Sequence, residues 1–247
     1  MATSVTPLDA FRHAYFSPID QYLAWHDGYE ADPAYLTALS ATERVQAEQE
    51  LLAALRTQQG DARAVLGLSY LRSEEALPLL HQCLRQNRYV HYALTAIAAI
   101  TPARLDRTLL RHVLLEKNSS ASHLIDVLLG LHDSFTLLQV GAEVARAVLD
   151  RFTHPDYLVR YHALNALRSL YGVPAPSDIH HDTLFGLICR KWAPSAYRRA
   201  HQLFISQVAT NTLHQFPLTD RATSNRPSWG LALRSMRSIW RRWLGGK

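Results

Sequence analysis

The sequence predicts an all-α protein, an α-solenoid in which antiparallel helix pairs are stacked along one axis. Three observations support this fold class. Four segments share one spacing of apolar residues, each is followed by a second amphipathic segment, and no run alternates like a half-buried strand for more than a few residues. A chain of 247 residues with 48% hydrophobic and 19% charged residues can bury a core of this kind.

The shared spacing defines the first helix of each pair. Apolar residues at i, i+1, i+3, i+4 and i+7 form a wide stripe on one side of a helix. Small residues occupy several of these positions, which lets a neighbouring helix approach closely. The four stripes begin at Ala64, Ala93, Leu124 and Ala163, so successive offsets are 29, 31 and 39 residues.

The second helix of each pair is predicted in the segments 73–86, 102–117, 133–152 and 177–192. Ser73, Asp133 and Ser177 are predicted N-caps, because short polar side chains accept hydrogen bonds from the first helical turn. Pro102 suits a first turn, where its missing N–H has no intrahelical partner to lose. These segments complete four helix pairs.

The regions outside the pairs divide the rest of the chain. Residues 1–58 are expected to form an N-terminal helical cap, with helices near 8–26, 33–39 and 42–58 and with Thr42 as an N-cap. The repeats span 59–192, and a C-terminal capping helix is predicted at 193–218. A linker rich in turn-forming residues follows at 219–228. Residues 229–247 are predicted to form a basic, Trp-rich amphipathic helix.

The stacked pairs resemble HEAT repeats of the short, HEAT-like variety. The phrases RYVHYALTAIAAI, from Arg88, and HPDYLVRYHALNALRSLYG, from His154, carry the resemblance, which covers residues 59 to about 192. It implies an α-solenoid with an extended curved surface. It implies no particular chemistry, because many functions occur on this fold.

The N-terminal region resembles bacterial HEAT-repeat proteins that are associated with polymorphic toxins. Two groups of residues carry this resemblance, Trp25-His26-Asp27-Gly28 and the helical pattern Glu43-Arg44 with Ala47-Glu48 and Leu51-Leu52. It implies an immunity protein that neutralises a cognate toxin. The same four-residue phrase also fits a helix end with an Asp-Gly turn and an anchoring indole.

The positive charge of the chain is concentrated near its C-terminus. The formal net charge is +5, from 26 Lys and Arg against 21 Asp and Glu. From Arg221 onward the sequence has seven basic residues and no acidic one, so the preceding 220 residues carry nineteen basic against 21 acidic residues. The repeats therefore do not have the uniform positive charge of a polyanion-binding protein, and no nucleic-acid partner is expected.

The terminal helix places Trp229, Trp240 and Trp243 on one stripe, with arginines largely off it. Three placements remain open for such a helix. It can dock on the end of the solenoid itself, insert into a groove of a partner, or lie on an anionic membrane surface. Docking within the chain would cover the apolar face of the last repeat.

Cysteine content and hydropathy indicate a cytoplasmic protein. Cys83 and Cys189 are too few for a disulfide scaffold or a four-cysteine zinc site, and both fit small core residues. The N-terminus lacks the pattern of a secretory signal, and no window resembles a transmembrane helix.

The sequence offers no motif for an enzyme. Its 13 histidines are never three or four residues apart, which excludes an HExxH zinc helix, and no Walker loop, GxGxxG or GxSxG occurs. A site assembled from different repeats, such as His91 with His162, stays open beside the simpler interpretation of ordinary hydrogen-bonded histidines. We therefore expect no catalytic residues, no metal and no cofactor.

The outward side of the second helices is the predicted partner surface. It carries residues of both charge signs, which suits a protein partner with its own charge pattern. The expected partner-binding residues are His81, Arg104, Arg107, Arg111, His112, Glu143, Arg146, His180 and His181, with Asp182 also predicted to point outward. The favoured function is an immunity or inhibitor protein that occludes the active site of a toxin.

Two other functions stay open. Resemblance to HEAT-like DNA glycosylases implies nucleic-acid binding. Two observations argue against it: the repeats are net acidic, and Asp126 lacks the neighbouring aromatic residue that a glycosylase pocket would have. Resemblance to HEAT-like bilin attachment proteins implies a lyase, and only the repeat itself supports that hypothesis.

Overall fold

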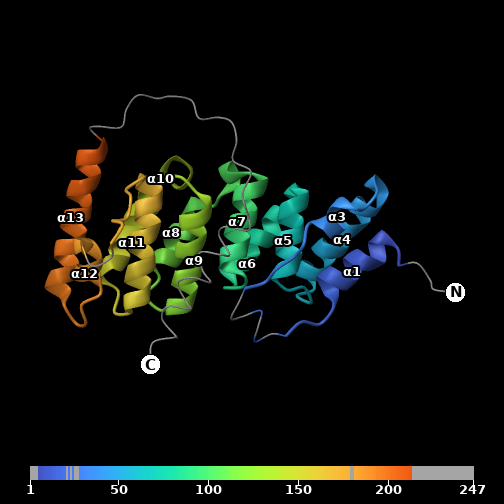
Figure 1. The fold of residues 1–247 in the computed structure, drawn as a ribbon, viewed down its shortest axis with the longest axis horizontal. Coiled ribbons are helices and arrows are strands. Elements are labelled where there is room, and N and C mark those ends of the chain that lie inside the picture. The colour runs from blue at the N-terminus through green and yellow to red at the C-terminus, as the bar shows by residue number, and fades with distance from the viewer. Residues whose placement is uncertain (1–4, 21, 23, 25–27, 179–180, 213–247) are drawn as a thin grey trace.

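All regular secondary structure in the described residues is helical (Figure 1). The structure is a computed structural model that describes residues 5–20, 22, 24, 28–178 and 181–212, and within these ranges no strand occurs. The helices are α1 (Pro7–Phe16), α3 (Ala34–Thr37), α4 (Ala41–Arg56), α5 (Ala62–Leu71), η1 (Glu74–Ala76), α6 (Leu77–Arg85), α7 (Val90–Ile100), η2 (Pro102–Arg104), α8 (Arg107–Leu115), α9 (Ala121–Ser134), α10 (Leu137–Asp150), η3 (Arg151–Thr153), α11 (Tyr157–Tyr171), α12 (Thr183–Ile188) and α13 (Pro194–Thr212).

The helices follow one another along the long axis of the molecule in chain order, from α1 at one end to α12 and α13 at the other (Figure 1). Helices α5, α7, α9 and α11 pack each against the next, and α8 packs against α10. One apolar core runs from Phe11 to Phe204. None of the described helices is both long and apolar enough to cross a lipid bilayer.

The predicted apolar stripe forms this core. Its residues in α11 are all buried, and so are those in α5, α7 and α9, apart from the half-buried Leu71, Ile100 and Ile125. The predicted close approach occurs at the stripe residue Gly67 of α5, where an added Cβ would lie 2.8 Å from side-chain carbons of Leu51 on α4 and Tyr15 on α1. A larger side chain there would force the neighbouring helices apart.

Three predicted N-caps, Thr42, Asp133 and Ser177, are wrong, and Ser73 makes no side-chain hydrogen bond as a cap. Ser40, not Thr42, caps α4: its side chain accepts from the Glu43 N–H while the Glu43 carboxylate accepts from the Ser40 N–H, in a capping box. Asp133 lies in the last turn of α9, and α10 begins only after Thr136. The Asp133 carboxylate binds two histidines instead of a helix start.

The starts of three second helices also differ from the prediction. Ser73 and Pro102 begin the short 3-10 turns η1 and η2, and α6 and α8 start only after these turns. Asp182, not Ser177, caps α12 by accepting from the Phe185 N–H at 3.1 Å. The predicted helix over 8–26 ends at Phe16, since proline at position 18 disfavours a helical residue before it.

Three buried arginines, Arg63, Arg160 and Arg168, hold distant segments together. Arg63 of α5 donates to the carbonyl oxygens of Ala14 at 2.8 Å and Ser17 at 2.7 Å, which fixes the end of α1 against α5. Arginine is usually exposed, so the burial of these three side chains was not expected from the sequence.

Candidate functional site

Arg104, Arg107, Arg111 and His112 lie where the sequence predicted them, on the exposed side of η2 and α8. Asp106 caps α8, because its carboxylate accepts from the Leu109 N–H at 2.9 Å. This cap fixes the start of the helix and therefore the side on which the arginines project. Burial of the apolar side of α8 leaves the basic side facing solvent.

Glu143 and Arg146 are exposed on α10, the helix that packs against α8. Arg107 joins the two helices: its guanidinium donates to the carbonyl oxygens of Gln139 at 2.9 Å and Leu138 at 3.3 Å. The structure therefore brings five of the predicted residues onto two adjacent helices, and Arg104 lies in η2 just before α8. We use the name α8–α10 face for these six residues and Leu138; at its edge Arg146 lines a depression with Tyr171 of α11 and Ile205 of α13.

The other predicted residues lie elsewhere. His81 of α6 is half-buried, and its Nε2 atom is buried without a hydrogen-bond partner among the described residues. His181 is exposed and pairs with Asp178 at 3.0 Å. His180 and the tryptophans Trp229, Trp240 and Trp243 fall outside the described residues.

The prediction that Asp182 points outward is wrong. Its carboxylate is buried and pairs with Arg168 of α11, at 2.6 Å and 2.9 Å. The helical spacing placed Asp182 on the outer side of a second helix, but the residue lies just before α12 and acts as its cap. It holds α12 to α11 and is not available to a partner.

Leu138 is the most exposed large apolar residue on the described helices, at 87%. It lies in the first turn of α10, and Gly141 follows with φ of 80° and ψ of 160°, which interrupts the helix. Such a backbone conformation is open to glycine and strained for other residues. The kink at Gly141 and the hydrogen bonds from Arg107 hold the first turn of α10, with Leu138 facing solvent.

A second group of polar side chains lies on α7, α9 and α11, and the sequence did not single it out as a whole. We name it the histidine–aspartate cluster: His91, Asp126, His132, Asp133 and His162. The Asp133 carboxylate lies 3.1 Å from Nε2 of His91 and 2.6 Å from Nδ1 of His132. His91 and His162, named above as residues that could meet across repeats, both interact electrostatically with Asp133.

The environment shifts the pKa values of three cluster residues. Burial acts to raise the pKa of Asp133, but hydrogen bonds from His132 and His91 outweigh burial and hold it below its ordinary value. Burial raises the pKa of Asp126, with a smaller opposing effect from His91. For His162, burial and then repulsion by His132 lower the pKa to about 4, against a weaker attraction to Asp133.

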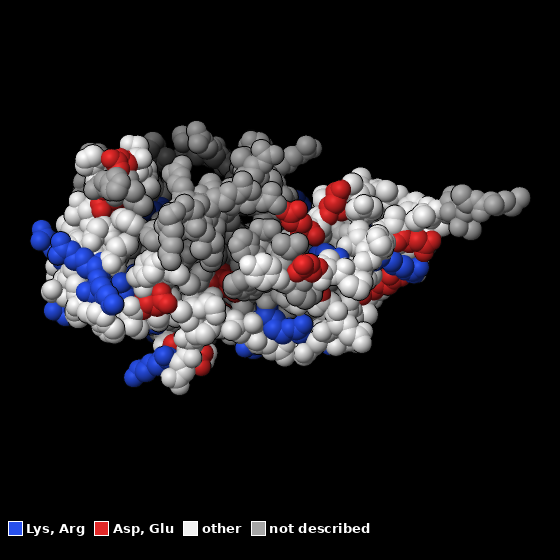
Figure 2. Space-filling model, turned by 60° about the horizontal axis from the view of Figure 1, so that its bottom comes forward, with Lys and Arg blue, Asp and Glu red and all other residues white. Residues whose placement is uncertain are grey.

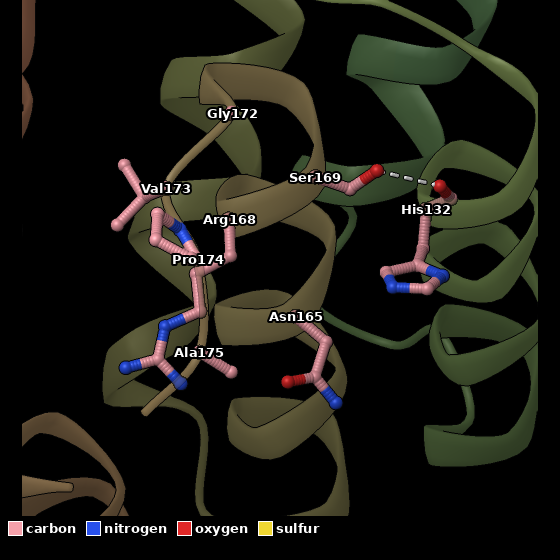
Figure 3. Close-up of a pocket in the computed structure, with 8 residues that line it drawn as sticks. All are labelled: His132, Asn165, Arg168, Ser169, Gly172, Val173, Pro174 and Ala175. Atoms are coloured by element: carbon pink, nitrogen blue, oxygen red, sulfur yellow. Dashed lines mark hydrogen bonds between the residues drawn. The ribbon is translucent and has the colours of Figure 1, made fainter. Parts of the chain in front are cut away.

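An open depression of about 360 Å³ adjoins this cluster between α9 and α11 (Figure 3). Figure 3 shows the side chains of His132 and Asn165 on facing sides of it, and the Ser169 hydroxyl donates to the His132 carbonyl oxygen at 2.8 Å. Ser169 is therefore engaged with the backbone. The depression offers polar groups but no paired nucleophile and base among the described residues.

No group of three or more His, Cys, Asp or Glu within the described ranges is arranged to hold a metal ion. Cys83 is buried, and burial raises the pKa of its thiol, as it does for Cys189. A raised thiol pKa disfavours the reactive thiolate. Both cysteines therefore act as packing residues in the described structure.

The pH dependence of stability tests the environment of His162. The unfolded residue has a pKa near 6.5 and the folded one a pKa of about 4, so between these values only the unfolded chain binds the proton. We expect the free energy of unfolding to fall as the pH drops from about 6.5 towards 4, with no contribution from this residue above about 6.5. In His162→Asn this part of the pH dependence should disappear.

Urea unfolding at a series of pH values measures this effect. His112→Asn, at an exposed histidine of α8, is the control and should keep the wild-type profile. Superimposable profiles for His162→Asn and the wild type would show that His162 is not shielded from solvent as described.

The described chain is thus an all-helical protein with a mixed-charge face on α8 and α10 and a histidine–aspartate cluster on α7, α9 and α11. Comparison of the chain with protein-family models, curated proteins and solved structures gave no match. Its function is therefore argued from its own residues.

Proposed function

We propose that the protein binds another protein through the α8–α10 face, as an α-solenoid of HEAT-like helix pairs. The observation that carries this proposal is Leu138, an apolar side chain 87% exposed on a turn that Arg107 holds in place. Leaving a leucine in water gives up about 1.5–3 kcal/mol of burial free energy. A partner that covers Leu138 would recover it.

The charged residues of the α8–α10 face fit a protein partner. Arg104, Arg111 and Arg146 supply exposed guanidinium groups, and Glu143 supplies the opposite charge. Arginine is enriched at the centres of protein interfaces, and charges of both signs select a partner with a complementary pattern. A surface of this composition suits a protein better than a uniform polyanion.

The partner in this proposal is a bacterial toxin, and the α8–α10 face would occlude its active site. This finer step rests on the resemblance of the N-terminal region to toxin-associated HEAT-repeat proteins. Of the residues that carry it, Trp25, His26 and Asp27 fall outside the described residues, while Leu51 and Leu52 are buried in the core. In this proposal the protein acts in the cytoplasm, by binding alone, without catalysis or a cofactor.

A growth-protection assay tests the proposal. The chain is co-expressed in a sensitive bacterial strain with the toxin domain encoded next to its own gene. The wild type should restore growth, and Leu138→Glu should weaken binding by about 100-fold and abolish protection, because a charge would be buried against the toxin. Isothermal titration with the purified toxin domain measures the affinity directly.

Val45→Glu is the matched control, since Val45 is also an exposed apolar residue, 61% exposed, but lies on α4. It should protect as well as the wild type. Equal loss in both variants would point to a general effect of the added charge, and a wild-type chain that neither binds nor protects against the toxin would refute the proposal.

Nucleic-acid binding is the alternative function, and one observation favours it. Burial raises the pKa of the Tyr92 hydroxyl, a hydrogen bond from the Tyr29 N–H lowers it, and the nearby Asp126 carboxylate raises it. Tyr92 is therefore an aromatic neighbour of Asp126. The sequence alone indicated no aromatic neighbour of Asp126. Binding to duplex DNA that weakens steeply with salt and is lost in Asp126→Asn would favour this alternative.

A further inference from the structure

The turn between α12 and α13 exposes a tryptophan in a strained backbone conformation. Trp192 is 79% exposed and has a φ of 52°, in the left-handed region that bulky residues rarely adopt. A tryptophan side chain offers the largest apolar area of any residue for burial. In this fold the Trp192 side chain is exposed to water, and the backbone conformation of Trp192 is energetically unfavourable as well.

Buried groups hold this turn from behind. Arg160 of α11, only 2% exposed, donates to the carbonyl oxygens of Ile188 at 2.6 Å and Arg190 at 3.4 Å. The Tyr197 hydroxyl of α13 donates to the same Arg190 oxygen at 2.5 Å, and the Arg160 guanidinium lies 4.3 Å from the centre of the Tyr197 ring. The backbone before Trp192 is therefore fixed between α11 and α13.

The exposed charges of α12, α13 and the turn between them are all positive. Arg190 and Lys191 are exposed directly before Trp192, and Arg198 and Arg199 are exposed on α13. From residue 183 to residue 212 the sequence has these four basic residues and no acidic one. Figure 2 shows basic side chains gathered at the end of the molecule that α12 and α13 form.

Of the two acidic residues just before α12, Asp182 is buried and neutralised by its pair with Arg168. Asp178 is exposed and lies 3.0 Å from His181, so the excess positive charge belongs to α12, α13 and the turn between them. The sequence after residue 212 extends the pattern, with seven Lys and Arg, one acidic residue and three tryptophans. The excess of basic over acidic residues near the C-terminus therefore begins at α12.

We propose that the α12–α13 turn, Arg190, Lys191 and Trp192, binds the surface of an anionic lipid bilayer. Tryptophan favours the headgroup region of a membrane, and each Lys or Arg close to an anionic surface contributes about 1 kcal/mol. The predicted amphipathic pattern of residues 229–247 suits the same surface. This inference does not depend on the toxin-binding proposal.

The geometry favours a lipid surface over a nucleic acid. Proteins that bind single strands combine a basic groove with several aromatic side chains on which successive bases stack. The turn presents one exposed aromatic residue, and neither of the two depressions described in the chain includes its residues. A protruding tryptophan between cations matches a flat anionic surface instead.

Vesicle flotation with the full-length protein tests the proposal. Vesicles of phosphatidylcholine alone are compared with equimolar phosphatidylcholine and phosphatidylglycerol. The wild type should float only with the anionic vesicles. Arg190→Gln with Lys191→Gln should weaken the partition by about 30-fold, the factor that corresponds to two charges of about 1 kcal/mol each, and Trp192→Ala should weaken it several-fold.

The matched control is Arg56→Gln with Arg72→Gln, which removes the same charge from exposed arginines near α4 and α5. It should bind like the wild type, and circular dichroism checks that every variant is folded. Equal losses in the two double variants, undiminished binding without Arg190 and Lys191, or equal binding to uncharged vesicles would each overturn the proposal. The proposal would also be overturned if the protein bound a single-stranded oligonucleotide through Arg190 and Lys191 and did not bind anionic vesicles.

Discussion

Replacing Arg160 by leucine is expected to lower the free energy of unfolding by about 3–5 kcal/mol. Besides the carbonyls of the α12–α13 turn, its guanidinium donates to the carbonyl oxygens of His154 at 2.5 Å and Pro155 at 2.8 Å. Leucine fills part of the volume but donates no hydrogen bond. The carbonyl oxygens of Ile188, His154 and Pro155 would therefore lose the hydrogen bonds from Arg160, and the contact with the Tyr197 ring would be lost as well.

Urea unfolding followed by circular dichroism measures this loss. Arg198→Leu removes an exposed arginine from α13 and should change the stability by less than about 0.5 kcal/mol. Arg160→Lys keeps the charge but lacks the planar fork that reaches several carbonyl groups, so it should also be strongly destabilised. Wild-type stability in Arg160→Lys would show that the charge matters and the geometry does not.

Replacing Asp182 by alanine is expected to cost about 3–5 kcal/mol, because it leaves the Arg168 guanidinium buried without its counter-charge. The same change removes the N-cap of α12. The variant with Arg168→Met as well has no buried charge to compensate. It should regain most of the loss and remain about 1 kcal/mol below the wild type, the value of the missing cap.

The Asp182 pair also predicts a pH dependence. Burial alone would raise the pKa of Asp182, but hydrogen bonds from Arg168 and the Phe185 N–H hold it below its ordinary value. The pair therefore stabilises the fold fully above about pH 3.9, and this contribution is lost as the pH falls lower. Urea unfolding at several acidic pH values should show this loss in the wild type and not in Asp182→Ala. A double variant no more stable than Asp182→Ala would contradict this account.

The all-helical class and the apolar stripe were predictable because both depend on residue periodicity. The stripe in α11 is buried, and the stripe residue Gly67 of α5 leaves no room for a Cβ beside Leu51 and Tyr15. Helix starts were less predictable, since several polar residues near each start can serve as a cap. Ser40 and Thr42 are both good capping residues, and only the reciprocal hydrogen bonds with Glu43 favour Ser40.

The candidate site was predictable in part for the same reason. The outward positions of Arg104, Arg111, Glu143 and Arg146 follow from the spacing along α8 and α10. The contact of Arg107 with α10 does not, because it depends on how the two helices lie against each other. For the histidine–aspartate cluster, the sequence left open only that His91 and His162 could meet. The contacts of Asp133 with His91 and His132 depend on how α7 packs against α9.

Residue spacing predicted the apolar residues of the core and the helical class, and residue counts showed where positive charge accumulates. Local preference and periodicity are properties of short segments, so neighbouring residues suffice to specify them. Only the tertiary structure decided that Arg160 and Arg168 are buried, that Asp133 joins His91 to His132, and that Trp192 stays exposed. These features depend on residues that meet across helices, and their free energy exists only once the helices have packed.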